Sequence, residues 1–301
     1  MPARCFATRS LLVLLPVLGV SWVSPALAQQ PTGLIVVAHG AGPEWNESVR
    51  ETVRQVRWQG PVEVAFLMGP ESHSAGWDSA LTRVSRAGVA RLVVVPLMVS
   101  SFGSHYRQIL HYAGQLDSMP TELASHNHHG LKPTIPVIVT AALDGAPEIA
   151  QVLHTRRQSW TDADRGRAIV LLGHGPGGAE DTRRWMDQLD AVGAALSADS
   201  SAPLVRSALL QDDAAAPVRA AAIAAMRDTV NALAARSADS VLVVPVMIAG
   251  GVLTRRTIPA DIQGLPVRYH PVGLTPHPAI ASWIERVARA ASPVETGAGL
   301  R

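Results

Sequence analysis

The chain has 301 residues, of which 48% are hydrophobic and 17% charged, and its 26 basic and 24 acidic side chains give a net charge of +2. This length is enough for two units with buried cores, and the absence of a basic run argues against nucleic acid as a partner. The single cysteine, Cys5, lies at the amino-terminal end, so the rest of the chain can form neither disulfides nor thiolate metal sites.

Residues 1–28 have the features of a secretory signal peptide. Met1–Arg9 is short and basic, Leu11–Val23 is apolar, and small side chains precede the expected cleavage point after Ala28. A membrane anchor is the alternative, but the apolar run is short for a bilayer and Pro16 interrupts it. Cleavage would remove two arginines and leave 24 residues of each sign. We expect a nearly neutral periplasmic or secreted protein with no membrane span after cleavage.

After this leader, short apolar runs alternate with amphipathic segments, a pattern that predicts parallel strands covered by helices. The expected strands of the first half are Leu34–Ala38, Val62–Met68, Arg91–Val99 and Thr134–Thr140. The expected helices of the first half are Glu44–Trp58, Ser79–Ala87, His105–Leu116 and Glu148–Arg157. The strands are apolar throughout, which is typical of a sheet buried on both faces.

The second half repeats this order. Its expected strands are Ala168–Leu172, Val205–Leu210, Ser240–Ile248 and Pro266–His270. Its expected helices are Asp181–Leu196, Pro217–Arg236 and His277–Ala291. The polar segment 156–167 predicts a connector, so we expect one domain over 29–158, a second over 165–292 and a flexible tail over 293–301.

Two pairs of similar segments show that the halves are repeats of one unit. Residues 33–42 read GLIVVAHGAG and residues 168–177 read AIVLLGHGPG, while RLVVVPLMV at 91–99 is matched by SVLVVPVMI at 240–248. His39 and His174 therefore fall at carboxyl ends of strands, where open α/β sheets place their ligand sites. We predict an α/β protein with two tandem lobes, each a mostly parallel four-stranded sheet with helices on both faces.

In its motifs the chain resembles the class II tetrapyrrole chelatases, the family of sirohydrochlorin cobaltochelatases and ferrochelatases. The resemblance rests on VAHGA at 37–41, VVPLMV at 94–99, GSH at 103–105 and LTPHP at 274–278, and it spans almost all of the chain after the leader. It implies two chelatase-like lobes with a cleft between them. It also implies a lyase that inserts a divalent metal ion into a sirohydrochlorin-type tetrapyrrole in that cleft, as in siroheme or cobalamin biosynthesis.

The resemblance also implies a set of site residues. The two family histidines fall on His39 and His105, which would hold the ion. The family acid that follows the second strand is replaced by Met68, and we expect Glu71 or His73 to substitute, with Glu71 as the catalytic residue. Because the second half has no histidine over 248–255, the first half is expected to hold the metal and the second to form the opposing wall.

The chemistry of metal insertion suits these residues. Neutral imidazoles bind borderline ions such as Co²⁺, Fe²⁺, Ni²⁺ or Zn²⁺, and two protein ligands leave positions open for the ring nitrogens. We expect Co²⁺ or Fe²⁺ as a substrate and no organic cofactor. Two pyrrole protons must also leave, and Glu44, Glu71 and His73 are candidate acceptors.

Sirohydrochlorin-type rings carry many carboxylates, which arginine binds in bidentate fashion. Arg107, Arg255 and Arg256 flank the two equivalent turns and are expected to bind substrate together with His174. The alternative for each arginine is a solvated surface charge, and for His174, which lacks a partner in the sequence motifs, a structural or cleft-polarity role. The histidine-rich loop with His126, His128 and His129 is either an auxiliary metal site or a polar exposed loop. The tryptophans could stack on a macrocycle, although core or surface packing is their usual role.

Three other functions were weighed. A hydrolase is disfavoured because G-x-S-x-G is absent, and a P-loop nucleotide site because G-x-x-x-x-G-K-[ST] is absent and Lys132 is the only lysine. The stronger alternative is an extracytoplasmic protein that binds a metal or a tetrapyrrole without catalysis, since Met68 replaces the family acid. The sequence fixes neither the ion, nor the ring, nor the oligomeric state.

Overall fold

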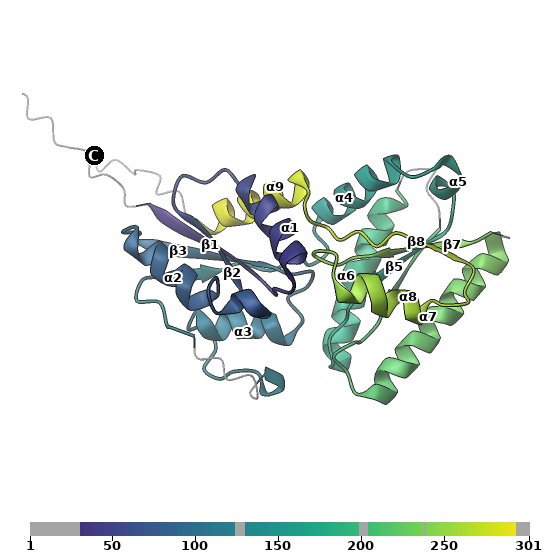
Figure 1. The fold of residues 1–301 in the computed structure, drawn as a ribbon, viewed down its shortest axis with the longest axis horizontal. Coiled ribbons are helices and arrows are strands. Elements are labelled where there is room, and N and C mark those ends of the chain that lie inside the picture. The colour runs from purple at the N-terminus through teal and green to yellow at the C-terminus, as the bar shows by residue number, and fades with distance from the viewer. Residues whose placement is uncertain (1–30, 124–129, 199–203, 238, 293–301) are drawn as a thin grey trace, which may run out of the picture.

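The computed structural model describes residues 31–123, 130–198, 204–237 and 239–292 (Figure 1). The expected signal peptide, the three loop histidines His126, His128 and His129, and the expected tail lie outside the described residues. Within the described part, no helix combines the length and the apolar character that crossing a membrane requires.

The first lobe is built on a parallel sheet with the strand order β2-β1-β3-β4. Its strands are β1 (Thr32–Ala38), β2 (Val62–Phe66), β3 (Arg91–Leu97) and β4 (Val137–Val139). In the centre of the sheet, Val36 pairs with Val64 on one side and with Val95 on the other. Residues 33–38 are all buried, because helices cover both faces.

The side chains of β1 alternate between these two faces, as the period of a strand requires. Leu34 and Val36 pack in the same cluster as residues of α1 (Pro43–Arg54), whereas Ile35 and Val37 pack in the same cluster as residues of α2 (Trp77–Arg86). The second face is also covered by α3 (Ser104–Tyr112). Two short 3₁₀ turns, η1 (Pro70–Ser72) and η2 (Thr121–Leu123), lie in the connections.

The second lobe repeats this plan with the strand order β6-β5-β7-β8. Its strands are β5 (Ile169–Gly173), β6 (Val205–Leu209), β7 (Val241–Pro245) and β8 (Val267–Tyr269), all parallel. The helices of this half are α5 (Asp162–Arg165), α6 (Ala179–Leu196), α7 (Ala216–Ser237), η3 (Leu253–Thr257) and α8 (Ile258–Asp261). The predicted fold class is therefore confirmed.

The last helix of each repeat packs on the other lobe. Helix α4 (Pro147–Gln158) follows β4 of the first lobe but packs against α6 of the second. Helix α9 (Pro278–Ala291) follows β8 of the second lobe but packs against α1 and β3 of the first (Figure 1). The predicted domain boundaries follow the repeat in the sequence. In the packed structure, each lobe instead includes the last helix of the other repeat.

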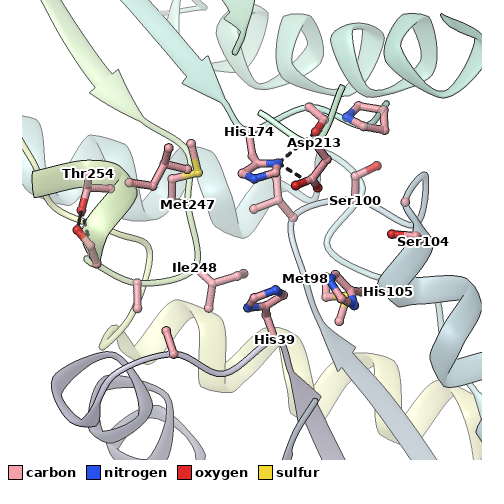
Figure 2. A pocket seen from close by; sticks show the side chains of 18 of the residues that line it. His39, Met98, Ser100, Ser104, His105, His174, Asp213, Met247, Ile248 and Thr254 are labelled. Atoms are coloured by element: carbon pink, nitrogen blue, oxygen red, sulfur yellow. Dashed lines mark hydrogen bonds and ion pairs between the residues drawn. The ribbon is translucent and has the colours of Figure 1, made fainter. Parts of the chain in front are cut away.

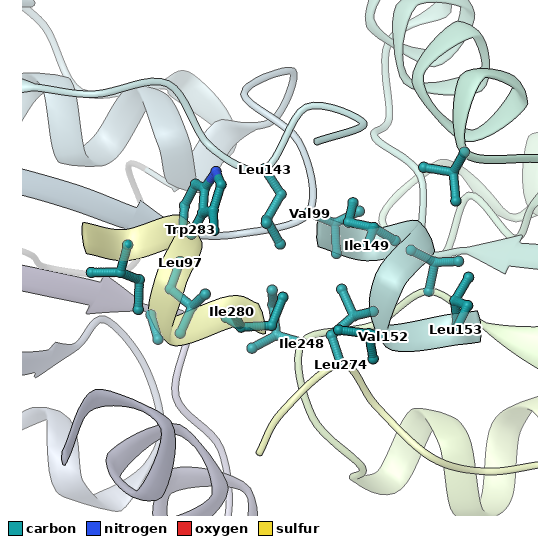
Figure 3. Packing of buried hydrophobic residues seen from close by; sticks show 14 of the residues in the cluster. Leu97, Val99, Leu143, Ile149, Val152, Leu153, Ile248, Leu274, Ile280 and Trp283 are labelled. Atoms are coloured by element: carbon teal, nitrogen blue, oxygen red, sulfur yellow. The ribbon is translucent and has the colours of Figure 1, made fainter. Parts of the chain in front are cut away.

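The exchanged helices join the two lobes through one apolar cluster. Trp283 and Ile280 of α9 lie beside Leu97 of β3, and Ile149 and Val152 of α4 continue the same cluster into the second lobe (Figure 3). These five side chains are at most 1% exposed. At the junction of the two helices, Arg286 donates to both carboxylate oxygens of Glu148 at 2.8 and 2.9 Å.

Candidate metal centre

A cavity of about 1230 Å³ lies between the lobes (Figure 2). The loops that follow β1 and β3 of the first sheet line it, together with the loops that follow β5, β6 and β7 of the second. Because parallel strands end at one edge of their sheet, both lobes present their carboxyl-terminal loops to one shared space. Its volume lies above the usual range for small-molecule sites, which is about 300–1,000 Å³.

His39 enters this cavity from the end of β1. Its backbone carbonyl accepts a hydrogen bond from the amide of Met68 at 2.7 Å, and Gly40 then turns the chain with φ = +85°. A side chain at position 40 would bring its Cβ to 2.4 Å from the carbonyl oxygen of Met68, so this tight turn needs glycine. His39 Nδ1 lies 2.7 Å from the carbonyl oxygen of Gly40. Since a carbonyl only accepts, Nδ1 carries the proton and Nε2 keeps its lone pair.

His105 reaches the same place from the first turn of α3. Its Nδ1 lies 2.9 Å from Oε1 of the buried Gln108, whose Nε2 donates to the Tyr112 hydroxyl at 2.9 Å. This chain of hydrogen bonds fixes the ring with a lone pair on Nε2. The rings of His39 and His105 meet edge to face, with centroids 4.6 Å apart and planes at 83°. The structure thus brings together the two side chains for which the sequence predicts metal binding.

The imidazole of His39 is held in its neutral form. The surrounding protein atoms, and after them the neighbouring His105, lower the pKa of His39 to about 4, even though the ring is accessible from the cavity. A neutral imidazole is the form that binds metal ions. Among the described residues, no three His, Cys, Asp or Glu side chains lie together in an arrangement that could hold an ion. The two imidazoles therefore form an open site.

Glu71, the expected catalytic acid, does not line the cavity. Its carboxylate pairs with Arg50 and accepts a hydrogen bond from Asn46 Nδ2 at 2.9 Å, and these bonds lower the pKa of Glu71. Asn46 in turn accepts from the amide of Ala41 at 2.9 Å. The prediction for Glu71 is corrected accordingly: its carboxylate anchors the loop that carries His39, because the chain after β2 turns away from the cavity. His73 lies outside the cavity as well.

The three predicted arginines all line the cavity. Arg107 on α3 donates to Asp181 of the second lobe at 2.8 Å, and Arg255 on η3 pairs with Glu44 of the first lobe at 2.6 Å. Glu44 and Asp181 occupy the first turns of equivalent helices, so these two ion pairs cross between the lobes at equivalent positions. Arg256 is exposed and makes no ion pair with another described residue.

His174 stands on the opposite wall in the same backbone setting as His39. It follows β5, Gly175 turns the chain with φ = +81°, and His174 Nδ1 lies 2.9 Å from the carbonyl oxygen of Gly175. His174 has a partner that the sequence reasoning missed. This partner is Asp213, whose Oδ2 lies 3.7 Å from His174 Nδ1. Aligning the repeats would have found it. Leu209-Leu210-Gln211 corresponds in register to Phe66-Leu67-Met68, so Asp213 lies two residues past the position of the family acid.

Other aromatic residues divide between the site and the scaffold. Trp45 and Trp185 line the cavity, whereas Trp283 is buried in the core. His277 is the N-cap of α9, and its Nδ1 accepts from the amide of Ala279 at 3.1 Å. It does not line the cavity, so helix capping accounts for its place in the sequence.

The duplicated parallel sheets, the shared cavity and the imidazole pair define the class of protein: they are those of a two-lobed class II tetrapyrrole chelatase. The CbiX family model matches the sequence twice, over residues 33–159 and 168–291, and the chain belongs to the CbiX family. No curated protein is similar enough in sequence to count as a relative. The resemblance inferred from the motifs is confirmed.

Solved structures show the same fold at low sequence identity. The sirohydrochlorin chelatase SirB of Bacillus subtilis subspecies spizizenii, in complex with cobalt, is 14% identical with a TM-score of 0.59, over 87% of this chain and 95% of that chain. SirB from Bacillus subtilis with Fe³⁺ is 16% identical with a TM-score of 0.58 over the same shares. DR2241 from Deinococcus radiodurans, a multi-domain protein with structural similarity to chelatases, is 15% identical with a TM-score of 0.57, over 88% of this chain and 56% of that chain.

Proposed function

We propose that this protein inserts a divalent metal ion into a sirohydrochlorin-type tetrapyrrole. The observation that carries the proposal is the imidazole pair: two rings 4.6 Å apart, both with Nε2 lone pairs, at the carboxyl edge of the first sheet in a cavity between the lobes. Membership of the CbiX family supports the same reading. Co²⁺ or Fe²⁺ is the proposed ion, in line with the metals named for the two SirB structures.

In this proposal His39 and His105 hold the ion weakly enough to release it. Two neutral nitrogen ligands bind a borderline divalent ion and leave most of its coordination positions for the ring nitrogens. A closed site with four protein ligands would retain the ion instead. Among the described residues, no third His, Cys, Asp or Glu completes a metal-binding group with the pair, which agrees with a transfer site.

The cavity walls supply contacts for the ring and its carboxylates. Met98, Met247 and Ile248 present apolar surface, and Trp45 can stack against a planar macrocycle. Arg256 can bind a substrate carboxylate directly, whereas the two arginines in ion pairs would exchange a protein carboxylate for one of the substrate. We further propose that the protein acts in the periplasm or outside the cell after loss of residues 1–28; the composition of that segment supports this.

A second function has one observation in its favour. Met68 stands where the family has an acid, and Glu71 is engaged outside the cavity. A protein with this site could bind a metal ion or a tetrapyrrole without turnover.

An anaerobic insertion assay separates the two functions. Purified protein is mixed with sirohydrochlorin and Co²⁺, and the absorbance spectrum of the ring reports insertion. We expect insertion above the protein-free background, and its loss in His39→Ala and His105→Ala. His154→Ala is the matched control, since that histidine is exposed on α4 and does not line the cavity. Tight binding of the ring with no spectral change beyond background would favour the binding protein.

A further inference from the structure

Insertion requires an acceptor for the two pyrrole protons. Glu71 and His73 lie outside the cavity, and the two first-lobe acids that line it, Glu44 and Glu122, are paired with Arg255 and Arg107. The imidazole pair itself is committed to the ion in the proposed function. The acceptor therefore has to come from another element that lines the cavity.

His174 has the geometry of a general base. Its Nδ1 donates to the carbonyl of Gly175 at 2.9 Å, which leaves a lone pair on Nε2. The Asp213 carboxylate lies 3.7 Å from Nδ1, where its negative charge stabilises the imidazolium that forms when Nε2 takes a proton. His174 can therefore take a proton at Nε2 while a carboxylate stands near the Nδ1 side of the ring.

Asp213 also differs from the other acids of the cavity. Among the described lining residues, Glu44, Glu122 and Asp181 all form ion pairs with arginines, at 2.6, 3.8 and 2.8 Å. Asp213 instead lies beside His174, with its Oδ2 3.7 Å from Nδ1 of the ring. The negative charge of Asp213 therefore acts on the His174 imidazole, whereas arginines offset the charges of the other three acids.

The two histidine sites belong to opposite walls. His39 and His105 come from the first lobe, and Figure 2 shows His174 and Asp213 across the cavity from them. A flat ring between these walls would turn one face to the imidazole pair and the other to His174. In this arrangement the metal ion approaches one face of the ring, and the other face is turned toward a proton acceptor.

We propose that His174 accepts the pyrrole protons on the face of the ring opposite the metal, with Asp213 as its positioning residue. This inference rests on the proposed function. Two ring N–H bonds break and their electron pairs form bonds to the metal ion. Each proton passes to Nε2 of His174 and from there to water, so two protons are released for each divalent ion inserted. The second lobe then takes part in the reaction although it lacks the second family histidine.

The test compares insertion with metal binding in the same variants. We expect His174→Ala to lower kcat for cobalt insertion by about 100-fold, the lower range for loss of a general base, while the calorimetric affinity for Co²⁺ alone stays unchanged. Added imidazole should restore part of the rate of His174→Ala. Asp213→Asn should lower kcat by about 10-fold, as for loss of a residue that orients a functional histidine. Asp190→Asn, on an exposed position of α6, is the control for charge.

Two results would overturn the inference while the proposed function stands. One is a wild-type rate in His174→Ala. The other is a loss of Co²⁺ affinity in His174→Ala without rescue by imidazole, which would make His174 a metal ligand. If the wild-type protein binds the ring but inserts neither Co²⁺ nor Fe²⁺, the proposed function fails and the inference fails with it.

Discussion

Single hydrogen bonds decide what the cavity residues can do. His39 and His174 are each bonded through Nδ1 to the carbonyl of the glycine that follows, and His105 to an amide oxygen. In all three rings Nδ1 therefore carries the proton and Nε2 keeps its lone pair. Glu71 acts one step further away, through Asn46, on the loop that carries His39.

The low pKa of His39 leads to a prediction at this scale. With a pKa of about 4 instead of the ordinary 6.5, the ring stays neutral in the folded protein over a window where the unfolded chain would protonate it. The folded state then binds fewer protons, so the contribution of His39 to stability falls as the pH drops from 6.5 to 4. In metal-free protein, NMR should show the His39 Cε1 proton titrating near pH 4, with His39→Asn identifying the resonance. A midpoint near 6.5 would contradict the described environment.

The residue scale is also where sequence reasoning was least complete. The strand-end position of His39 and the motif around His105 were enough to predict that both belong to one site. Distance along the sequence could not show which way Glu71 points, because that depends on Asn46 and Arg50, which bond the two oxygens of its carboxylate. Asp213 is not part of a recognisable motif. Only the alignment of the two repeats shows that it lies close to the position of the family acid.

At the scale of elements, the exchange of α4 and α9 determines how the lobes hold together. Trp283 of α9 is 1% exposed and packs in the cluster that runs from β3 of one lobe to α4 of the other. The alternation of apolar and amphipathic segments predicted every strand and every helix of nine or more residues in the described part of the chain. It could not predict the exchange, because an apolar helix face does not specify which sheet it covers. It also missed short elements, among them α5, η3 and α8.

Removing the central side chain of this cluster should test the coupling of the lobes. Trp283→Ala deletes a fully buried indole, and we expect a loss of about 3–5 kcal/mol in the free energy of unfolding. Because the cluster is continuous, thermal unfolding should remain a single transition at a lower Tm. The measurement is calorimetry together with urea unfolding, with the exposed Val218→Ala on α7 as the control. Two separate transitions in the wild-type protein would show that the lobes unfold independently.

At the scale of the whole molecule, the cavity belongs to neither lobe alone. Arg107 reaches Asp181 and Arg255 reaches Glu44, so both ion pairs span the space in which a substrate would lie. The imidazole pair of His39 and His105 and the His174–Asp213 pair likewise come from different lobes. The repeat could be predicted from the sequence, whereas the facing arrangement of its two ligand edges required the structure.

Export is the prediction that concerns the whole chain. If residues 1–28 are a cleaved leader, intact-mass analysis of protein from a periplasmic fraction should find a chain that begins at Gln29. Changing the small residues Ala26 and Ala28 to aspartate should block processing and leave the longer chain with the membranes. Recovery of full-length protein from the cytoplasm would contradict the proposal.

Because α4 and α9 are exchanged, each half of the chain supplies a helix that covers apolar surface of the other half. Cleavage of the chain between α4 and β5 would leave two fragments that stay associated, because one helix of each fragment packs against the other fragment. A gene encoding either half by itself would instead yield a polypeptide with one face of its sheet only partly covered and with the helix that packs on the other half. After such a duplication the two copies can diverge in chemistry, but neither keeps its sheet fully covered without the helix of the other.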